Sequence, residues 1–261
     1  MTQGNSTSPR ERITAAIRAA SAAGEPALVA YLTAGFPARA RFVQDVRAVG
    51  RGADVIEIGV PFTDPMADGV TIQRSSQAAL AQGVTLEWIL SELAAAALRD
   101  TPILLMSYLN PLLAFGLPKL ARAAARAGVS GFIVPDLPFD ESSTLHYALA
   151  RESLALVQMV TPVTRPARLD ELCAASEGFV YAVTMTGTTG KTVSIPAETL
   201  AYLDRVRSKS ELPVCAGFGI RTPEHFARLR GHVDGVIVGS ALVEVLERGE
   251  DPAAWLAALR R

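Results

Sequence analysis

Three carboxylates have the residue type and spacing to do chemistry in this sequence. Glu57 lies inside an apolar run, and Asp64 and Asp68 follow it on a loop shaped by proline and glycine. Burial of a carboxylate without a partner is costly and raises its pKa, so that it can exchange a proton near neutral pH. The segment therefore predicts acid–base chemistry. A structural interpretation stays open for each residue: a satisfied buried Glu57, a turn at Asp64 and a helix cap at Asp68.

Glycines near the end of the chain predict a phosphate site. Gly217-Phe218-Gly219 and Gly239-Ser240 each close an apolar run, and the second pair directly precedes a helix-like segment. Glycine lets backbone N–H groups approach an anion, and a helix N-terminus adds a favourable dipole. A third glycine-rich segment, residues 186–191, could complete the cradle or close as a lid. Tight turns are the structural alternative for these glycines.

The elements that must position these residues form a regular rhythm. Eight nearly continuous apolar runs recur, which is typical of parallel strands covered on both faces. They are Ala27–Leu32, Asp54–Ile58, Ile103–Tyr108, Gly131–Val134, Leu154–Val160, Phe179–Val183, Pro213–Ala216 and Gly235–Val238, and most precede a helix-like segment.

This rhythm predicts an α/β fold, a single-domain (β/α)8 TIM barrel over residues 10–261. An extra helix is expected at 10–23, and residues 1–9 are expected to be a disordered tail. A doubly wound open sheet is the main competitor, but no G-x-G-x-x-G follows the first strand. Catalytic groups of such barrels lie at the carboxyl ends of the strands, and phosphate binds beyond strands seven and eight.

Composition narrows the class of protein. The 261 residues are 49% hydrophobic and 20% charged with a net charge of −1, and no basic cluster indicates nucleic-acid binding. Apolar runs are far shorter than the roughly 20 residues of a membrane span, and the polar start does not resemble a secretory signal. Two distant cysteines and three histidines without ligand spacing indicate neither a disulfide framework nor a metal site. We expect a cytoplasmic enzyme.

The segment from Glu57 to Gly69 resembles the signature of the tryptophan synthase α subunit family. Other blocks are similar to the family's in the expected order, and the resemblance runs from about Arg10 to the C-terminus. These blocks are Tyr31–Pro37, Met106–Pro111, Pro135–Pro138, Gly217–Ile220 and Gly239–Ala241.

The resemblance implies retro-aldol cleavage of indole-3-glycerol phosphate to indole and glyceraldehyde 3-phosphate. It implies that Glu57 is the acid/base at indole C3 and at the adjacent hydroxyl, and that Asp68 binds the indole N–H. Each such proton transfer contributes roughly 10²–10⁴-fold to the rate. No metal or organic cofactor is implied in this chain.

The resemblance also implies three further groups of residues. Phosphate ligands correspond to Thr189, Gly190, Gly219, Gly239 and Ser240. The indole pocket corresponds to Tyr31, Ile72, Tyr108, Tyr181 and Phe218, for whose aromatic rings ordinary barrel core is the alternative. A pyridoxal-phosphate β subunit is the implied partner in an α2β2 heterotetramer, with docking at Pro61, Asp64, Met66, Asn110 and Pro138.

The segment after strand six departs from the family. Where the family frequently has Arg after a Ser, this chain has Met185 after Thr184. Whether this loop closes, and whether it communicates with a β subunit, are therefore open questions. Three other functions also stay open: a stand-alone indole-releasing lyase, a phosphosugar isomerase or epimerase, and a non-catalytic subunit that activates its partner.

Overall fold

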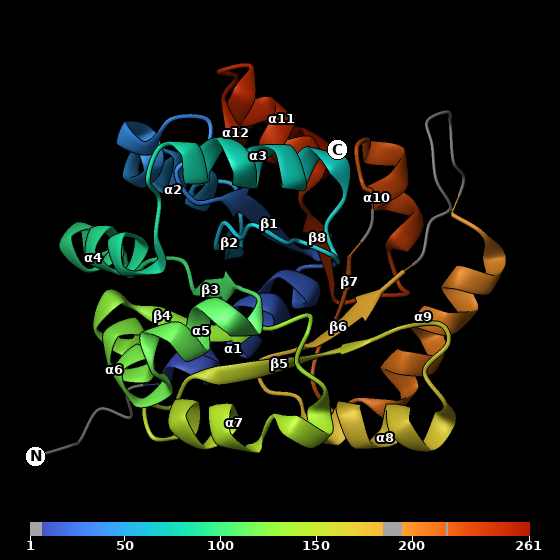
Figure 1. Cartoon of the computed structure of the whole chain (residues 1–261). Coiled ribbons are helices and arrows are strands. Elements are labelled where there is room, and N and C mark those ends of the chain that lie inside the picture. The colour runs from blue at the N-terminus through green and yellow to red at the C-terminus, as the bar shows by residue number, and fades with distance from the viewer. Residues whose placement is uncertain (1–6, 185–194, 218) are drawn as a thin grey trace, which may run out of the picture.

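Eight parallel strands close into a barrel in which each strand pairs with the next and β8 pairs with β1 (Figure 1). The computed structural model describes residues 7–184, 195–217 and 219–261. The strands are β1 (Ala27–Thr33), β2 (Val55–Gly59), β3 (Ile103–Met106), β4 (Val129–Ile133), β5 (Ala155–Val160), β6 (Val180–Val183), β7 (Val214–Gly217) and β8 (Gly235–Val238).

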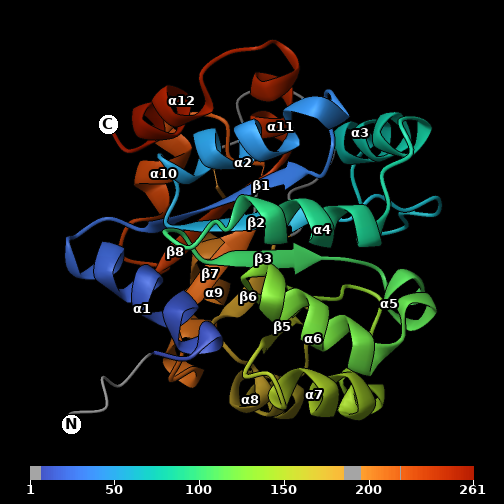
Figure 2. The same cartoon turned by 90° about the vertical axis from the view of Figure 1, so that its left-hand side faces the viewer.

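Helices surround this barrel in both views (Figures 1 and 2). They are α1 (Pro9–Ala22), α2 (Phe42–Gly50), α3 (Val70–Ala81), α4 (Leu86–Ala96), α5 (Leu109–Phe115), α6 (Leu117–Ala127), α7 (Ser143–Ala150), α8 (Pro166–Ala175), α9 (Ala197–Lys209), α10 (Pro223–Leu229), α11 (Ser240–Glu247) and α12 (Pro252–Leu259), with short 3-10 helices at Arg39–Arg41 and Phe139–Glu141. Within the described ranges, no helix has the length and apolar character needed to cross a bilayer.

Two apolar layers hold the barrel together, because side chains alternate between its two faces along each strand. The outer layer packs strand residues such as Leu28, Ile58 and Val236 against the helices. An inner layer is built from residues of alternating register such as Val29, Val55 and Leu104.

The extra N-terminal helix closes one end of the barrel. Ile13 and Ile17 of α1 are fully buried and belong to the inner layer. Figure 2 shows α1 at the end opposite to the one from which α3 and α5 start. The amino ends of the strands are therefore sealed, and the carboxyl ends remain for a site.

The predicted barrel is confirmed, whereas the predicted limits of β3 were wrong. The apolar run was expected to continue to Tyr108, but β3 ends at Met106 and Tyr108 is the N-cap residue of α5. Helices α4, α5 and α12 were not among the predicted helix-like segments, and α3 was expected only as the segment that Asp68 would cap. For α4 a cap was present in the sequence, since the Thr85 hydroxyl accepts a hydrogen bond from the Trp88 N–H. The single-domain division stays a prediction.

Candidate active site

A cavity of about 680 Å³ opens at the carboxyl ends of the strands. Its walls come from all parts of the chain, with Glu57 and Asp68 on one side and the glycines after β7 and β8 on another. The remaining lining residues include Tyr31, Ile72, Met106, Pro135, Met159, Thr161, Tyr181, Thr184 and Arg221. Eight parallel strands bring these distant segments together because all of their carboxyl ends face the same way.

Glu57 is a buried carboxyl group that faces the cavity without a partner for one of its oxygens. It lies in β2 two residues after Val55 of the inner layer, and its register neighbours are Tyr31 and Leu104. Only 1% of the residue is exposed, and no described donor reaches Oε2. Burial, followed by the negative charge of Asp68, raises the pKa of Glu57 to about 8. The group therefore holds a proton at neutral pH.

Asp68 lies on the loop between β2 and α3, where Tyr108 holds it. The Tyr108 hydroxyl accepts a hydrogen bond from the Ala67 N–H (2.9 Å) and donates one to Asp68 Oδ2 (3.2 Å). Burial raises the pKa of Tyr108 to about 12, so this hydroxyl stays a neutral donor. Burial also raises the pKa of Asp68, against the opposing effect of this hydrogen bond.

The helix-cap interpretation of Asp68 is wrong. The N-cap residue of α3 is Gly69, in an extended conformation and without a side-chain cap. The carboxylate of Asp68 points instead toward Tyr108 and lines the cavity. The side chain is thus available to a ligand.

Tyr31 is fixed by a chain of buried hydroxyl groups. The Ser75 hydroxyl donates to the Ile72 carbonyl (2.8 Å), so its oxygen accepts from Thr33 (2.6 Å). Thr33 in turn accepts from the Tyr31 hydroxyl (3.3 Å). The Tyr31 hydroxyl therefore donates its hydrogen bond to a group inside the protein, and the Tyr31 ring lines the cavity.

The backbone of β2 approaches Tyr31 so closely that only glycine fits. A Cβ added to Gly59 would lie 2.0 Å from the Tyr31 hydroxyl oxygen and 2.5 Å from Cζ. Gly217 has the same relation to Tyr181, whose ring would lie 2.5 Å from an added Cβ. These two glycines therefore let the aromatic rings lie flat across the strands.

We expect Gly59→Ala to lower the free energy of unfolding by about 1–3 kcal/mol, the usual range for overpacking. The buried Tyr31 ring would have to move out of its position in the cavity wall. Urea unfolding followed by circular dichroism measures the change. Gly219→Ala is the control, because its added Cβ meets no described atom within 4 Å. Equal stability of the two variants would contradict the role given to Gly59.

The predicted phosphate end lies where β7 and β8 finish. Gly219, Gly239 and Ser240 all line the cavity, and Ser240 is the first residue of α11. Backbone N–H groups of this helix start have no intrahelical acceptors, and the helix dipole favours an anion there. Thr189, Gly190 and Phe218, which were predicted for phosphate and indole, lie outside the described residues, as does Met185.

The structure brings most of the predicted indole pocket to this cavity. Tyr31, Ile72 and Tyr181 line it, and Tyr108 stands behind Asp68 with its ring stacked on Phe62 at 5.1 Å between centroids. Several other lining residues were not predicted, and three of these follow the register of a strand. Met106 and Met159 lie two residues beyond Leu104 and Val157 of the inner layer, and Thr161 lies two residues further on. The period-two register of a strand is the signal that could have found them.

The predicted docking residues differ in their exposure to solvent. Asp64, Asn110 and Pro138 are exposed, and Met66 is an exposed apolar side chain (84%). Pro61 is buried, so it can shape its loop but offers no surface. Val70 (80%) and Leu113 (51%) are further exposed apolar side chains on α3 and α5.

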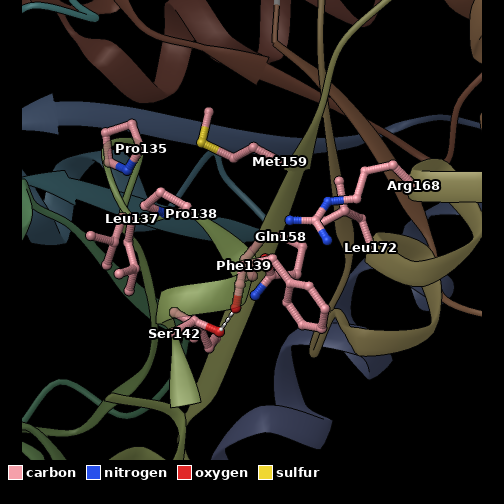
Figure 3. Close-up of a pocket in the computed structure, with 12 residues that line it drawn as sticks. Pro135, Leu137, Pro138, Phe139, Ser142, Gln158, Met159, Arg168 and Leu172 are labelled. Atoms are coloured by element: carbon pink, nitrogen blue, oxygen red, sulfur yellow. Dashed lines mark hydrogen bonds between the residues drawn. The ribbon is translucent and has the colours of Figure 1, made fainter. Parts of the chain in front are cut away.

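A second, smaller hollow of about 160 Å³ lies between the loop after β4, strand β5 and α8 (Figure 3). Pro135 and Met159 line both cavities. Among the described residues of its wall, Arg168 is the only charged one, and it is already paired with Asp140 and Glu171. Because the described residues that line this hollow include no carboxyl group, the acid–base chemistry belongs to the larger cavity.

The barrel and its mouth define a class of protein. A protonated buried carboxyl group, a second carboxylate and a glycine-lined helix start together suit acid–base chemistry on a phosphorylated substrate. These features define the class of phosphate-binding (β/α)8-barrel enzymes that use carboxyl groups for acid–base chemistry.

Comparison with known proteins narrows this class to a family. Residues 17–259 match the family model described as tryptophan synthase alpha chain. The tryptophan synthase alpha chain of Nitratidesulfovibrio vulgaris is 44% identical over 249 residues, which cover 95% of this chain and 97% of that protein. That of Carboxydothermus hydrogenoformans is 45% identical over 226 residues, covering 86% and 85%. The chain belongs to the tryptophan synthase alpha chain family, which cleaves indole-3-glycerol phosphate to indole and glyceraldehyde 3-phosphate in tryptophan biosynthesis.

Solved structures agree with this assignment. A chain of Mycobacterium tuberculosis tryptophan synthase superimposes with a TM-score of 0.86 at 35% identity, covering 95% of this chain and 96% of that one. The alpha chain of Legionella pneumophila gives 0.83 at 32% identity, with coverages of 95% and 94%. The family resemblance noted in the sequence is thus confirmed.

Proposed function

We propose that this chain cleaves indole-3-glycerol phosphate with Glu57 as the acid and base and Asp68 as the group that binds the indole N–H. The observation that carries this proposal is Glu57 itself, a buried carboxyl group in the cavity wall with an unpartnered oxygen. Burial of an unpartnered carboxyl group costs free energy, so such a group is typical of a functional site. Its raised pKa gives it the proton that the first step requires.

In the first step the Glu57 carboxyl group donates its proton to indole C3. The ring nitrogen then carries positive charge, and the carboxylate of Asp68 stabilises its N–H through a charge-assisted hydrogen bond. Ionised Asp68 is already aligned by the Tyr108 hydroxyl. The product of this step is the protonated indolenine (3H-indolium) form, in which the bond from C3 to the side chain can break.

In the second step the Glu57 carboxylate takes the proton of the hydroxyl group next to C3. The oxygen forms the aldehyde C=O, the carbon–carbon bond breaks, and its electron pair returns to the indole ring. Indole keeps the first proton on C3, and Glu57 regains a proton from the hydroxyl. Glu57 is therefore protonated at the end of the cycle, as it was at the start.

The phosphate anchors the substrate at the opposite end of the cavity. Gly219, Gly239 and Ser240 are the described candidates for this contact, and Thr189 and Gly190 are proposed with them from the sequence. Tyr31, Ile72, Tyr181 and Phe218 are proposed to enclose the indole ring. Anchoring at a distance from the reacting carbon positions C3 against Glu57.

A tryptophan synthase β subunit is the proposed partner, in an α2β2 assembly within the cytoplasm. The exposed apolar side chains of Met66, Val70 and Leu113 near the cavity mouth suit such a contact. Asp64, Asn110 and Pro138 are proposed to dock there, with Pro61 supporting the loop. The proposed reaction uses no metal or organic cofactor in this chain; pyridoxal phosphate is expected only in the β subunit.

The experiment that tests this function measures indole release from indole-3-glycerol phosphate by the purified chain, with and without a β subunit. We expect slow turnover by the chain alone and a rise when the β subunit is added. Fast turnover without the partner would indicate a stand-alone indole producer. Absence of indole in both conditions would overturn the enzymatic proposal.

A further inference from the structure

Arg221 lies at the phosphate end of the cavity without having been predicted as part of the site. It follows Gly219 and Ile220 on the loop after β7 and lines the same cavity as Gly239 and Ser240. Among the described residues that line the cavity, it is the only cation. A phosphorylated substrate brings roughly two negative charges to this place at neutral pH.

A carboxylate on α11 holds this arginine. Arg221 Nη1 donates to Glu244 Oε2 (2.7 Å) and Nη2 donates to Glu244 Oε1 (2.9 Å). The pair raises the pKa of Arg221 and lowers that of Glu244, in each case chiefly through these hydrogen bonds, so both groups are charged. The two charges cancel, and the phosphate end has no net positive charge from this pair.

The pairing leaves part of the guanidinium group available. Arginine has five N–H groups, and the two contacts with Glu244 use two of them. The Arg221 side chain is about half exposed (49%), whereas that of Glu244 is 28% exposed. Glu244 is also tied to α3, since it accepts a hydrogen bond from the Thr71 hydroxyl (3.4 Å). The carboxylate is therefore the fixed member of the pair, and the arginine is the one that can turn.

We propose that Arg221 is an additional phosphate-binding residue and that Glu244 sets its strength. The inference rests on the proposed function and extends its phosphate site. When the phosphate group binds beside Ser240, the remaining N–H groups of Arg221 donate to its oxygens while Glu244 keeps the guanidinium in place. Because Glu244 opposes the anion, its charge weakens phosphate binding and so favours release of the phosphorylated product.

The two members of the pair should have effects of opposite sign, which a merely structural ion pair would not show. Loss of the cation in Arg221→Ala leaves the Glu244 carboxylate beside the phosphate, so the Kd for inorganic phosphate should rise roughly threefold to tenfold. Loss of the anion in Glu244→Gln should lower this Kd by roughly threefold. The double variant should lie between the two single variants.

Titration calorimetry with inorganic phosphate measures these Kd values, and inhibition of indole release by phosphate checks them in the reaction. Arg221→Lys keeps the charge and should recover most of the affinity lost in Arg221→Ala. Arg10→Ala is the matched control, because Arg10 also pairs with a carboxylate, Glu177, and lies on α1 at the other end of the barrel. Thermal unfolding of each variant shows that it is folded before it is titrated.

The role of Arg221 would be overturned if the unmodified chain, Arg221→Ala, Glu244→Gln and the double variant bound phosphate equally well while indole release stayed intact. A fall in affinity in both single variants would show a structural ion pair and would also overturn it. Graded phosphate affinity without indole release by any form, even with a β subunit, would overturn the proposed function and leave the role of Arg221 standing.

Discussion

Glu57→Gln is expected to lower indole release from indole-3-glycerol phosphate by about 10²–10⁴-fold, the contribution of a positioned acid–base group. Glutamine has nearly the shape of glutamate but can neither donate the proton to C3 nor accept the proton of the hydroxyl. Steady-state kinetics in the presence of a β subunit measure the loss, which should fall on kcat because the substrate contacts remain.

The pH dependence of the reaction offers a second measurement of the same role. The pKa of Glu57 is raised from 4.5 to about 8, so the proton needed for the first step is lost as the pH rises through 8. Activity of the unmodified chain should therefore fall on the alkaline side. On the acid side, activity should fall as Asp68 becomes protonated, at a pH above its ordinary value because burial raises its pKa.

Stability should change in the opposite direction to activity in Glu57→Gln. The folded-state pKa lies above the ordinary value, so the folded state holds an extra proton between 4.5 and about 8. Stability of the unmodified chain therefore falls as the pH rises through this window, by about 1.4 kcal/mol for each unit of pKa difference. The variant lacks this penalty and should be the more stable protein at pH 8 and above.

Thermal unfolding of both proteins from pH 5 to pH 9 checks this expectation. Glu177→Gln is a control, since that carboxylate is paired with Arg10 and accepts a hydrogen bond from the Leu156 N–H. It should lose stability where Glu57→Gln gains it. An active Glu57→Gln variant would contradict the proposed chemistry, and a destabilised one would contradict the unpartnered state of the carboxyl group.

Asp68→Asn is expected to lower kcat/KM by about 10–100-fold, which corresponds to the roughly 1.5–3 kcal/mol of a hydrogen bond to a charged group. The asparagine oxygen can still accept the indole N–H, but it brings no negative charge to the positive ring nitrogen. The loss should therefore be smaller than for Glu57→Gln.

The same substitution should also move the alkaline limit of the reaction. The charge of Asp68 contributes, after burial, to the raised pKa of Glu57. Its removal should lower that pKa, so activity should begin to fall at a lower pH in Asp68→Asn. An unchanged alkaline limit would show that the two carboxyl groups do not interact.

Tyr108→Phe separates the position of Asp68 from its charge. This variant keeps the carboxylate and removes the hydroxyl that donates to it. Because that hydrogen bond lowers the pKa of Asp68, its loss should move the acid limit to higher pH while the alkaline limit remains. A Tyr108→Phe variant as inactive as Asp68→Asn would place Tyr108 itself among the groups that contact the substrate.

Much of this architecture was predictable because it depends on local patterns. Parallel strands covered on both sides need continuous apolar runs. The apolar runs between Ala27 and Val238 are long and regular enough for the strands to be counted from the sequence. The anomaly of Glu57 is visible for the same reason, since a carboxylate between Ile56 and Ile58 contradicts its surroundings. Gly239, directly before α11, likewise indicates a close approach of the backbone to an anion.

Element limits were less predictable where a polar residue inside an apolar run decides them. The apolar run of β3 resumes at Tyr108 after the polar Ser107, but the chain turns there into α5, where Asp136 accepts a hydrogen bond from the Leu109 N–H (2.9 Å). That contact joins residues 27 positions apart. No local pattern contains it.

The sequence by itself determined the order of the strands, the buried carboxylate and the glycine before α11, because each depends on residues close in the chain. Only the tertiary structure decided which groups meet: Tyr108 with Asp68, Tyr31 with Gly59, and Arg221 with Glu244. The physical reason is closure of the barrel. Contacts across its mouth follow from the register of eight strands, and register is a property of the whole sheet rather than of any one segment.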